Sequence, residues 1–296
     1  MNLQEYYQAN GYVVVRQLIP IELVDRLITI YQRDILPSKH PFFRQNTNRY
    51  EPNEINEFGY VKQAFLDIHD YNNFSEFSTS AKKLFCAPEL HQALKEITGS
   101  SACNLMQTML FDSNTATTPH QDCWYLDSVP NGHLIGAWIA LEDIEEEAGR
   151  FFVIPKTTEI DLHSDTPDLP HDQWLERMRN YVDENSERVF APALRAGDVL
   201  FWNSRTIHGA LPNINPRYSR KSLTGHYLPS EYAFGNLFVQ KDYIQYQDFN
   251  GIKYYRNQPD YSLLNKLKFK VKTSVYNSPT ALKMMREIQS ILVKKH

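Results

Sequence analysis

The sequence predicts a mainly β protein, an antiparallel sandwich or barrel with helices at its flanks. Short runs of apolar or alternating residues recur between residues 103 and 227, and turns rich in Gly, Pro or acidic residues separate them. This spacing of short strands is typical of sandwiches and barrels. The expected strands are Cys103 to Phe111, Leu134 to Leu141, Arg150 to Ile154, Asp198 to Trp202 and Ser222 to Tyr227.

Helical patterns are concentrated in the first hundred residues. Leu3 to Asn10 predicts a short helix, and Tyr12 to Val15 predicts a strand rich in β-branched residues. Pro20 begins a second helix to about Ile35 with an apolar stripe on one face. The remaining helical patterns are Ser80 to Phe85, Pro88 to Ile97 and, as an insertion between strands, Asp172 to Val182.

The polar stretch from Ser38 to Phe58 has no strong period and predicts a long loop. Loops of this length in compact domains often serve as lids or binding loops. Arg44 and Arg49 are therefore candidate substrate contacts, with ordinary exposed loop residues as the alternative.

Composition limits the class of protein. Apolar residues make up 42% of the 296 residues, and no run approaches the length of a membrane span. The amino terminus shows neither a basic start nor an apolar stretch, and three cysteines without a pattern favour reduced thiols. We therefore expect a soluble cytoplasmic protein. A net charge of −4 is too mild to indicate nucleic acid, and no membrane partner is expected.

Charge and aromatic content divide the chain into two parts. Residues 236–296 hold eleven Lys and Arg against four Asp and Glu and are rich in tyrosine and phenylalanine. We expect residues 1–235 to form one domain, with residues 236–296 as an extension that packs on it or acts as a lid. A solvated basic face is the alternative interpretation of this charge.

The run His120-Gln121-Asp122 predicts a metal site. Residues two apart in an extended segment point the same way, so His120 and Asp122 can meet one cation. His208, in a later apolar segment, is the best candidate for a third ligand. Two histidines and one carboxylate form the facial triad of non-haem Fe(II) oxygenases, which leaves coordination positions open.

Arg220 is the candidate for binding the carboxylate of a co-substrate. In a strand it shares a face with Ser222. A guanidinium binds a carboxylate through two hydrogen bonds, and a neighbouring hydroxyl would add a third.

Several motifs in order resemble the phytanoyl-CoA dioxygenase family of Fe(II)/2-oxoglutarate oxygenases. They lie between about residues 5 and 230: Tyr7 to Arg16, His120 to Asp122, Gly136 to Asp143, Ala148-Gly149, Gly197 to Phe201, His208-Gly209 and Arg220. The resemblance implies a double-stranded β-helix, or jelly roll, with His120, Asp122 and His208 on Fe(II), and with 2-oxoglutarate and O2 as co-substrates. It also implies that Arg220 and Ser222 bind 2-oxoglutarate, with Gln107, Gln121 and Trp138 close by.

The resemblance further implies oxidation of an unactivated C–H bond by hydroxylation, desaturation or ring closure. Candidate substrate contacts beyond the loop arginines are Trp124, Tyr125, Arg205 and Tyr227. This mixture of cationic and aromatic groups favours a small acidic or amino-acid-like metabolite or a natural-product intermediate, bound by a monomer or homodimer. Alternatives are an acyl-CoA hydroxylase, a non-catalytic or ligand-binding jelly roll, and a zinc hydrolase of similar fold.

Overall fold

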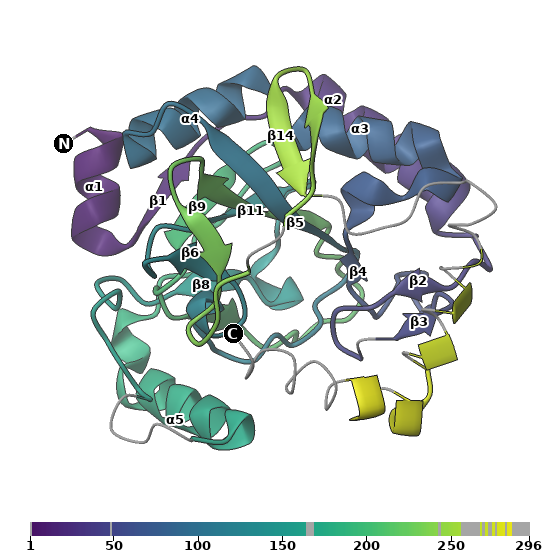
Figure 1. The fold of residues 1–296 in the computed structure, drawn as a ribbon. Coiled ribbons are helices and arrows are strands. Elements are labelled where there is room, and N and C mark those ends of the chain that lie inside the picture. Colours follow the sequence, from purple (N-terminus) through teal and green to yellow (C-terminus); the bar gives the residue numbers. More distant parts are fainter. Residues whose placement is uncertain are drawn as a thin grey trace.

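A computed structural model describes residues 2–47, 49–163, 169–241 and 244–255, together with residues 267, 270–271, 274–275, 277–281 and 283–285. Its centre is an eight-stranded sheet in the order β1-β9-β7-β11-β5-β14-β13, with β4 also paired to β5 (Figure 1). All pairs except β14 with β5 are antiparallel. The strands are β1 (Tyr12–Val15), β4 (Phe65–Leu66), β5 (Cys103–Phe111), β7 (Ile135–Ala140), β9 (Val199–Asn203), β11 (Ser222–Pro229), β13 (Tyr246–Phe249) and β14 (Ile252–Tyr255).

Three smaller antiparallel pairs complete the strands. They are β8 (Phe151–Val153) with β10 (His208–Ala210), β6 (Asp127–Val129) with β12 (Ala233–Gly235), and β2 (Phe42–Phe43) with β3 (Tyr50–Glu51). Phe151 from β8 packs against Trp138 and Trp202 from the large sheet. The fold is therefore the double-stranded β-helix that the sequence predicted, with helices toward its amino terminus.

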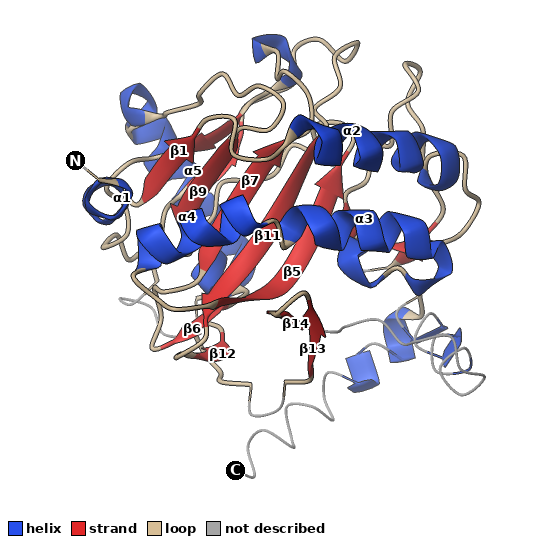
Figure 2. Cartoon of the chain, turned by 90° about the horizontal axis from the view of Figure 1, so that it is seen from above, coloured by secondary structure: helices blue, strands red, loops and turns tan. Residues whose placement is uncertain are grey.

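Helices cover the outer face of the large sheet. Figure 2 shows α2, α3 and α4 lying across its strands. Leu27, Leu84 and Leu90 of these helices share one buried cluster with Phe201 and Leu223 of the sheet. An apolar stripe on each helix thus meets every second residue of the strands. The helices are α1 (Leu3–Asn10), α2 (Ile21–Ile30), α3 (Ser75–Phe85), α4 (Pro88–Thr98) and α5 (His171–Glu184).

The predicted elements agree closely with the structure. The helix at Leu3–Asn10 and the strands at Tyr12–Val15 and Cys103–Phe111 have the predicted bounds. The second predicted helix changes into a π-helical turn at Tyr31–Ile35. The short strands β6, β10 and β12 were not predicted, because each has three residues that, unlike the apolar Phe151–Val153 of β8, form no apolar run.

The described part of the extension beyond residue 235 includes a hairpin on the edge of the large sheet. Tyr254 of β14 pairs with Leu105 of β5 and joins the main core. His69 lies beside it and hydrogen-bonds to the Tyr255 carbonyl through Nε2 over 2.9 Å. The hairpin is thus held by both backbone and side-chain contacts.

The three cysteines, Cys86, Cys103 and Cys123, are all buried free thiols. No helix within the described ranges combines the length and apolar character needed to cross a bilayer.

Candidate active site

Two strand-like segments bring the predicted metal ligands together. His120 and His208 form an antiparallel bridge, in which each backbone N–H donates to the other carbonyl over 3.0 Å. Asp122 follows at the start of a 3₁₀ turn, Asp122–Trp124. Side chains separated by 86 positions in the sequence therefore point into one space.

The geometry of these three side chains suits one metal ion. Oδ1 of Asp122 lies 3.5 Å from Nε2 of His120 and 3.5 Å from Nε2 of His208. One ligand atom from each residue lies within 4.8 Å of the others. Two imidazoles and a carboxylate on one side of an ion are the donors that ferrous oxygenases use.

The histidine rings are held so that Nε2 is presented to this space. Nδ1 of His120 donates to the Thr118 carbonyl over 2.7 Å, and Nδ1 of His208 donates to the Thr206 carbonyl over 2.9 Å. Such contacts select the tautomer whose Nε2 carries the free lone pair. Burial alone would raise the pKa of Asp122, but its interactions with His208 and His226 hold that pKa well below its usual range. The carboxyl is thus poised to bind a cation.

A largely apolar cavity between the two sheets contains the three ligands. The large sheet supplies Met109, Phe111, Trp138, Trp202, Thr224 and His226, Arg220 comes from the segment just before β11, and the remaining walls come from Gln45, Thr117, Phe151 and Ala210. Most of the surface that faces this cavity is apolar, with a few polar groups, which is the character expected of a small-molecule site.

Arg220 is the cation in this cavity, and no acidic side chain in the described ranges forms an ion pair with it. Its side chain is buried, with 2% of the residue exposed. One Nη donates to the Gly149 carbonyl over 3.1 Å, whereas Nε has no hydrogen-bond partner in the same ranges. Burial lowers the pKa of Arg220 to about 10. A buried guanidinium with unused donors is the feature expected of a site for an anionic ligand.

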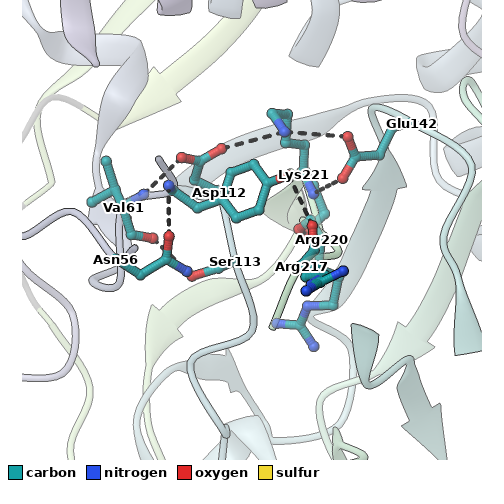
Figure 3. A network of polar contacts seen from close by, with 10 residues as sticks. Asn56, Val61, Asp112, Ser113, Glu142, Arg217, Arg220 and Lys221 are labelled. Atoms are coloured by element: carbon teal, nitrogen blue, oxygen red, sulfur yellow. Dashed lines mark hydrogen bonds and ion pairs between the residues drawn. The ribbon is translucent and has the colours of Figure 1, made fainter. Parts of the chain in front are cut away.

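The nearby acidic residues are neutralised by Lys221 instead. Figure 3 shows Lys221 turned toward Asp112 and Glu142, and its Nζ lies 3.6 Å and 3.3 Å from their carboxylates. Asp112 also accepts the Val61 backbone N–H over 2.8 Å. Because successive residues of a strand face opposite ways, this network occupies Lys221 and leaves Arg220 to the cavity.

The predicted 2-oxoglutarate contacts lie in different places. Trp138 lines the cavity with Arg220, whereas Ser222 is the first residue of β11 and its hydroxyl donates to the Arg220 carbonyl over 3.3 Å. Gln107 pairs in register with His226 of β11. Gln121 instead donates from Nε2 to the carbonyls of Ile160, over 3.0 Å, and Arg205. Gln121 therefore connects the backbone segments that contain Ile160 and Arg205.

None of the six predicted substrate contacts is among the residues that line the cavity. Arg44 is fully buried, with its guanidinium 4.3 Å from the Phe65 ring, and Arg49 is exposed. Tyr227 donates to the Phe85 carbonyl on the helical face of the sheet. Arg205 lines a separate cleft beside α1 and α4.

Trp124 and Tyr125 lie next to the metal site. The Tyr125 ring centroid is 5.7 Å from that of His120, and 42% of Tyr125 is exposed. Trp124 stacks on Trp174 at 4.4 Å. The ring of His120 is therefore bordered by one partly exposed aromatic side chain, that of Tyr125.

Trp202 and His226 are site residues to which the sequence assigned no role. Both contact Asp122, over 2.7 Å and 3.3 Å. A signal for His226 existed, because every second residue after Arg220 shares its face of the strand, and this alternation passes through Ser222 and Thr224 to His226. Trp202 carried no comparable signal, since a tryptophan in an apolar strand is usually core.

A jelly roll that places a His-Asp-His triad beside a buried arginine defines a Fe(II)/2-oxoglutarate-dependent oxygenase. The family model "Phytanoyl-CoA dioxygenase (PhyH)" matches residues 7–222. The chain therefore belongs to the phytanoyl-CoA dioxygenase family.

Known proteins agree with this assignment. Peroxisomal phytanoyl-CoA dioxygenase from Bos taurus is 25% identical over 248 residues, covering 76% of this chain and 67% of that protein. The epimerase SnoN, solved with Fe3+, alpha ketoglutarate and nogalamycin RO, has a TM-score of 0.54 at 19% identity, covering 80% of this chain and 86% of SnoN. EctD from S. alaskensis, solved with 2-oxoglutarate and 5-hydroxyectoine, has a TM-score of 0.55 at 15% identity, covering 80% of this chain and 78% of EctD. Membership of this family, together with the His-Asp-His triad, assigns iron and 2-oxoglutarate as the cofactors.

Proposed function

We propose that His120, Asp122 and His208 hold the ferrous ion and that Arg220 binds the distal carboxylate of 2-oxoglutarate. The observation that supports this proposal is that the triad and Arg220 line the same cavity. Among the residues that line it, Arg220 is the one buried guanidinium without a charged partner in the described part of the chain. The dicarboxylate supplies the charge that Arg220 lacks, and the triad supplies the metal for its keto-acid end. Ser222 adds a hydroxyl beside the guanidinium, and Trp138 forms an apolar wall.

The reaction assigned to this site is oxidation of an unactivated C–H bond. Bound iron, O2 and 2-oxoglutarate supply the oxidising chemistry, with succinate and CO2 as the co-products. The protein's own side chains orient the ligands, and Met109, Phe111 and Phe151 provide apolar walls for the cavity. Hydroxylation, desaturation and ring closure all begin from such a bond.

The substrate portion that enters the cavity is uncharged. Arg220 serves the co-substrate and Asp122 serves the metal, and the other lining residues are apolar, polar or histidine. The sequence predicted a substrate with an acidic group. We place that group outside the cavity, near the aromatic rings of Tyr125 and Trp124. The proposal is thus a small metabolite or natural-product intermediate with an apolar reacting part.

Hydroxylation of an acyl-CoA is the second candidate. Relatives named phytanoyl-CoA dioxygenase are 25% identical to this chain, and an apolar cavity suits an alkyl chain. A mass shift of +16 on an acyl-CoA, with no reaction of free small acids, would favour this candidate over the first.

The test begins with anaerobic addition of Fe(II) and 2-oxoglutarate to the full chain. We expect a weak visible absorption band that disappears in Asp122→Ala, and succinate release once oxygen is admitted. A protein that binds both ligands but releases no succinate with any of a broad set of substrates would instead be a non-catalytic relative. Binding of Zn2+ without any effect of 2-oxoglutarate would favour the hydrolase alternative.

Location, assembly and domain division are also proposals. Three buried free thiols support a reducing compartment, for which the cytoplasm is our proposal, although several relatives are named peroxisomal. We propose a monomer or homodimer, with residues 1–235 as the catalytic domain and 236–296 as an extension. Size-exclusion chromatography with light scattering, and localisation of the tagged chain, test these points.

A further inference from the structure

The carboxylate of Asp122 uses its two oxygens for different purposes. Oδ1 faces Nε2 of both ligand histidines, at 3.5 Å each. Oδ2 accepts the indole N–H of Trp202 over 2.7 Å and lies 3.3 Å from Nε2 of His226. One oxygen of the carboxylate, Oδ1, is therefore directed toward the metal position, and the other, Oδ2, is bound by protein side chains.

Both contacts to Oδ2 are donations from the protein. An indole nitrogen can only donate, and an ionised carboxylate can only accept, so Nε2 of His226 carries a proton in this contact. The other ring nitrogen of His226, Nδ1, is buried and has no hydrogen-bond partner among the described residues. Within that part of the chain, the contact with Asp122 is thus the one hydrogen bond of the His226 ring.

The sheet brings these two rings together across a glycine. Trp202 of β9 pairs with Gly136 of β7, and Gly136 pairs with His226 of β11. The three residues form one row across adjacent strands, with the smallest in the middle. The rings of Trp202 and His226 then meet edge to face, with centroids 5.9 Å apart. A side chain at position 136 would separate them.

We propose that Trp202 and His226 are positioning residues that restrict Asp122 to one iron-binding oxygen, with Gly136 as the spacer that lets both reach it. This inference rests on the proposed metal site. Two donors on Oδ2 oppose rotation of the carboxylate into a two-oxygen contact with iron. A coordination position that a second oxygen would occupy is thereby kept open for the co-substrates. Residues that orient a metal ligand in this way commonly change metal affinity by about 10-fold to 100-fold when removed.

The experiment removes each donor and measures the metal rather than turnover. Trp202→Phe and His226→Phe keep an aromatic ring without the N–H, and a double variant combines them. Anaerobic Fe(II) titration with saturating 2-oxoglutarate gives the affinity and the position of the visible band. Co(II) absorption, whose intensity falls as coordination number rises, reports the second oxygen.

For each single variant we expect about a 10-fold or larger loss of Fe(II) affinity. We also expect a shifted band and weaker Co(II) absorption. The conservative replacements sharpen the test. The amide nitrogen of a glutamine falls near Nε2 of the histidine it replaces, whereas that of an asparagine falls near Nδ1. His226→Gln should therefore recover most of the affinity, and His226→Asn should not.

Trp174→Phe and His91→Phe make the same changes at buried positions outside the cavity. They should leave affinity and spectra unchanged, and thermal unfolding checks that every variant is folded. Folded donor-less variants with wild-type Fe(II) affinity and spectra would overturn the proposal. So would equal behaviour of the Gln and Asn variants. A wild-type chain that binds neither Fe(II) nor 2-oxoglutarate would contradict the metal site itself, which separates the two failures.

Discussion

A Cβ atom on Gly136 would lie 2.2 Å from the indole ring of Trp202. This distance is far below van der Waals contact, and the indole is held in place by its hydrogen bond to Asp122. The glycine is therefore required by close approach and not by its backbone conformation.

Gly136→Ala is expected to displace Trp202 and weaken iron binding. Overpacking of this kind costs about 1–3 kcal/mol of unfolding free energy. We also expect about a 10-fold loss of Fe(II) affinity, since the contact with Asp122 is disturbed. Gly225→Ala is the matched control, because its Cβ would crowd Phe85 on the outer face of the sheet. That variant should lose stability but bind Fe(II) normally, and equal Fe(II) affinities for the two variants would contradict the prediction.

Arg220→Met should stabilise the protein without ligands while abolishing 2-oxoglutarate binding. A buried charge without a partner opposes folding, and an apolar side chain of similar length removes that cost, which we place at about 1 kcal/mol or more. Urea unfolding of the two proteins measures the first effect. The rise in melting temperature on adding 2-oxoglutarate, expected only for the wild type, measures the second. Arg220→Lys keeps the charge but not the two-pronged geometry and should fall between them.

Gln121→Leu distinguishes a structural role from contact with the co-substrate. Its amide binds the carbonyls of Ile160 and Arg205, and leaving such groups unpaired costs about 1–3 kcal/mol. We expect lower stability with an unchanged KM for 2-oxoglutarate. A several-fold increase in KM at unchanged stability would instead support the role implied by family resemblance.

His91 makes stability depend on pH. Burial lowers the pKa of His91 to about 4, and Nε2 hydrogen-bonds to the Phe85 carbonyl over 3.3 Å. The folded state therefore holds a neutral ring, whereas the unfolded chain takes up a proton below its ordinary pKa of about 6.5. Stability from this group is complete above pH 6.5 and falls as the pH drops toward 4, by about 2 kcal/mol at pH 5.

The measurement for His91 compares urea unfolding at pH 7 and pH 5 for the wild type and His91→Gln. The glutamine can still donate to the carbonyl but does not titrate. We expect a smaller loss between the two pH values for the variant. Parallel losses would assign the acid sensitivity to other groups.

The sequence predicted the elements whose patterns are long or unambiguous. Cys103–Phe111 spans nine residues bounded by turns, so its assignment was secure. His120, Asp122 and His208 could be proposed because few residue types bind iron and their order matches a family. Their convergence depends on the bridge between His120 and His208, which neither segment reveals alone.

The predictions about charged substrate contacts show the limit of sequence reasoning. Arg44 reads as a polar loop residue, yet Phe42 and Phe65 surround its guanidinium and it is fully buried. The direction of a loop side chain depends on tertiary contacts that no local pattern encodes. The role of Trp202 was not predicted either, because a tryptophan in an apolar strand reads as a core residue. The sequence does not show that its indole N–H donates to Asp122.

Strand β5 is protected along its outer edge by two short pieces of chain that are remote from each other in sequence. Phe65 and Leu66 of β4 pair with one half, and Tyr254 of β14 pairs with Leu105 in the other. A shortened protein ending near residue 235 would uncover the second half and leave the His69 imidazole without its carbonyl partner. Unpaired backbone groups on an exposed edge recruit strands from other molecules. Such a fragment is expected to aggregate even though every iron ligand is retained.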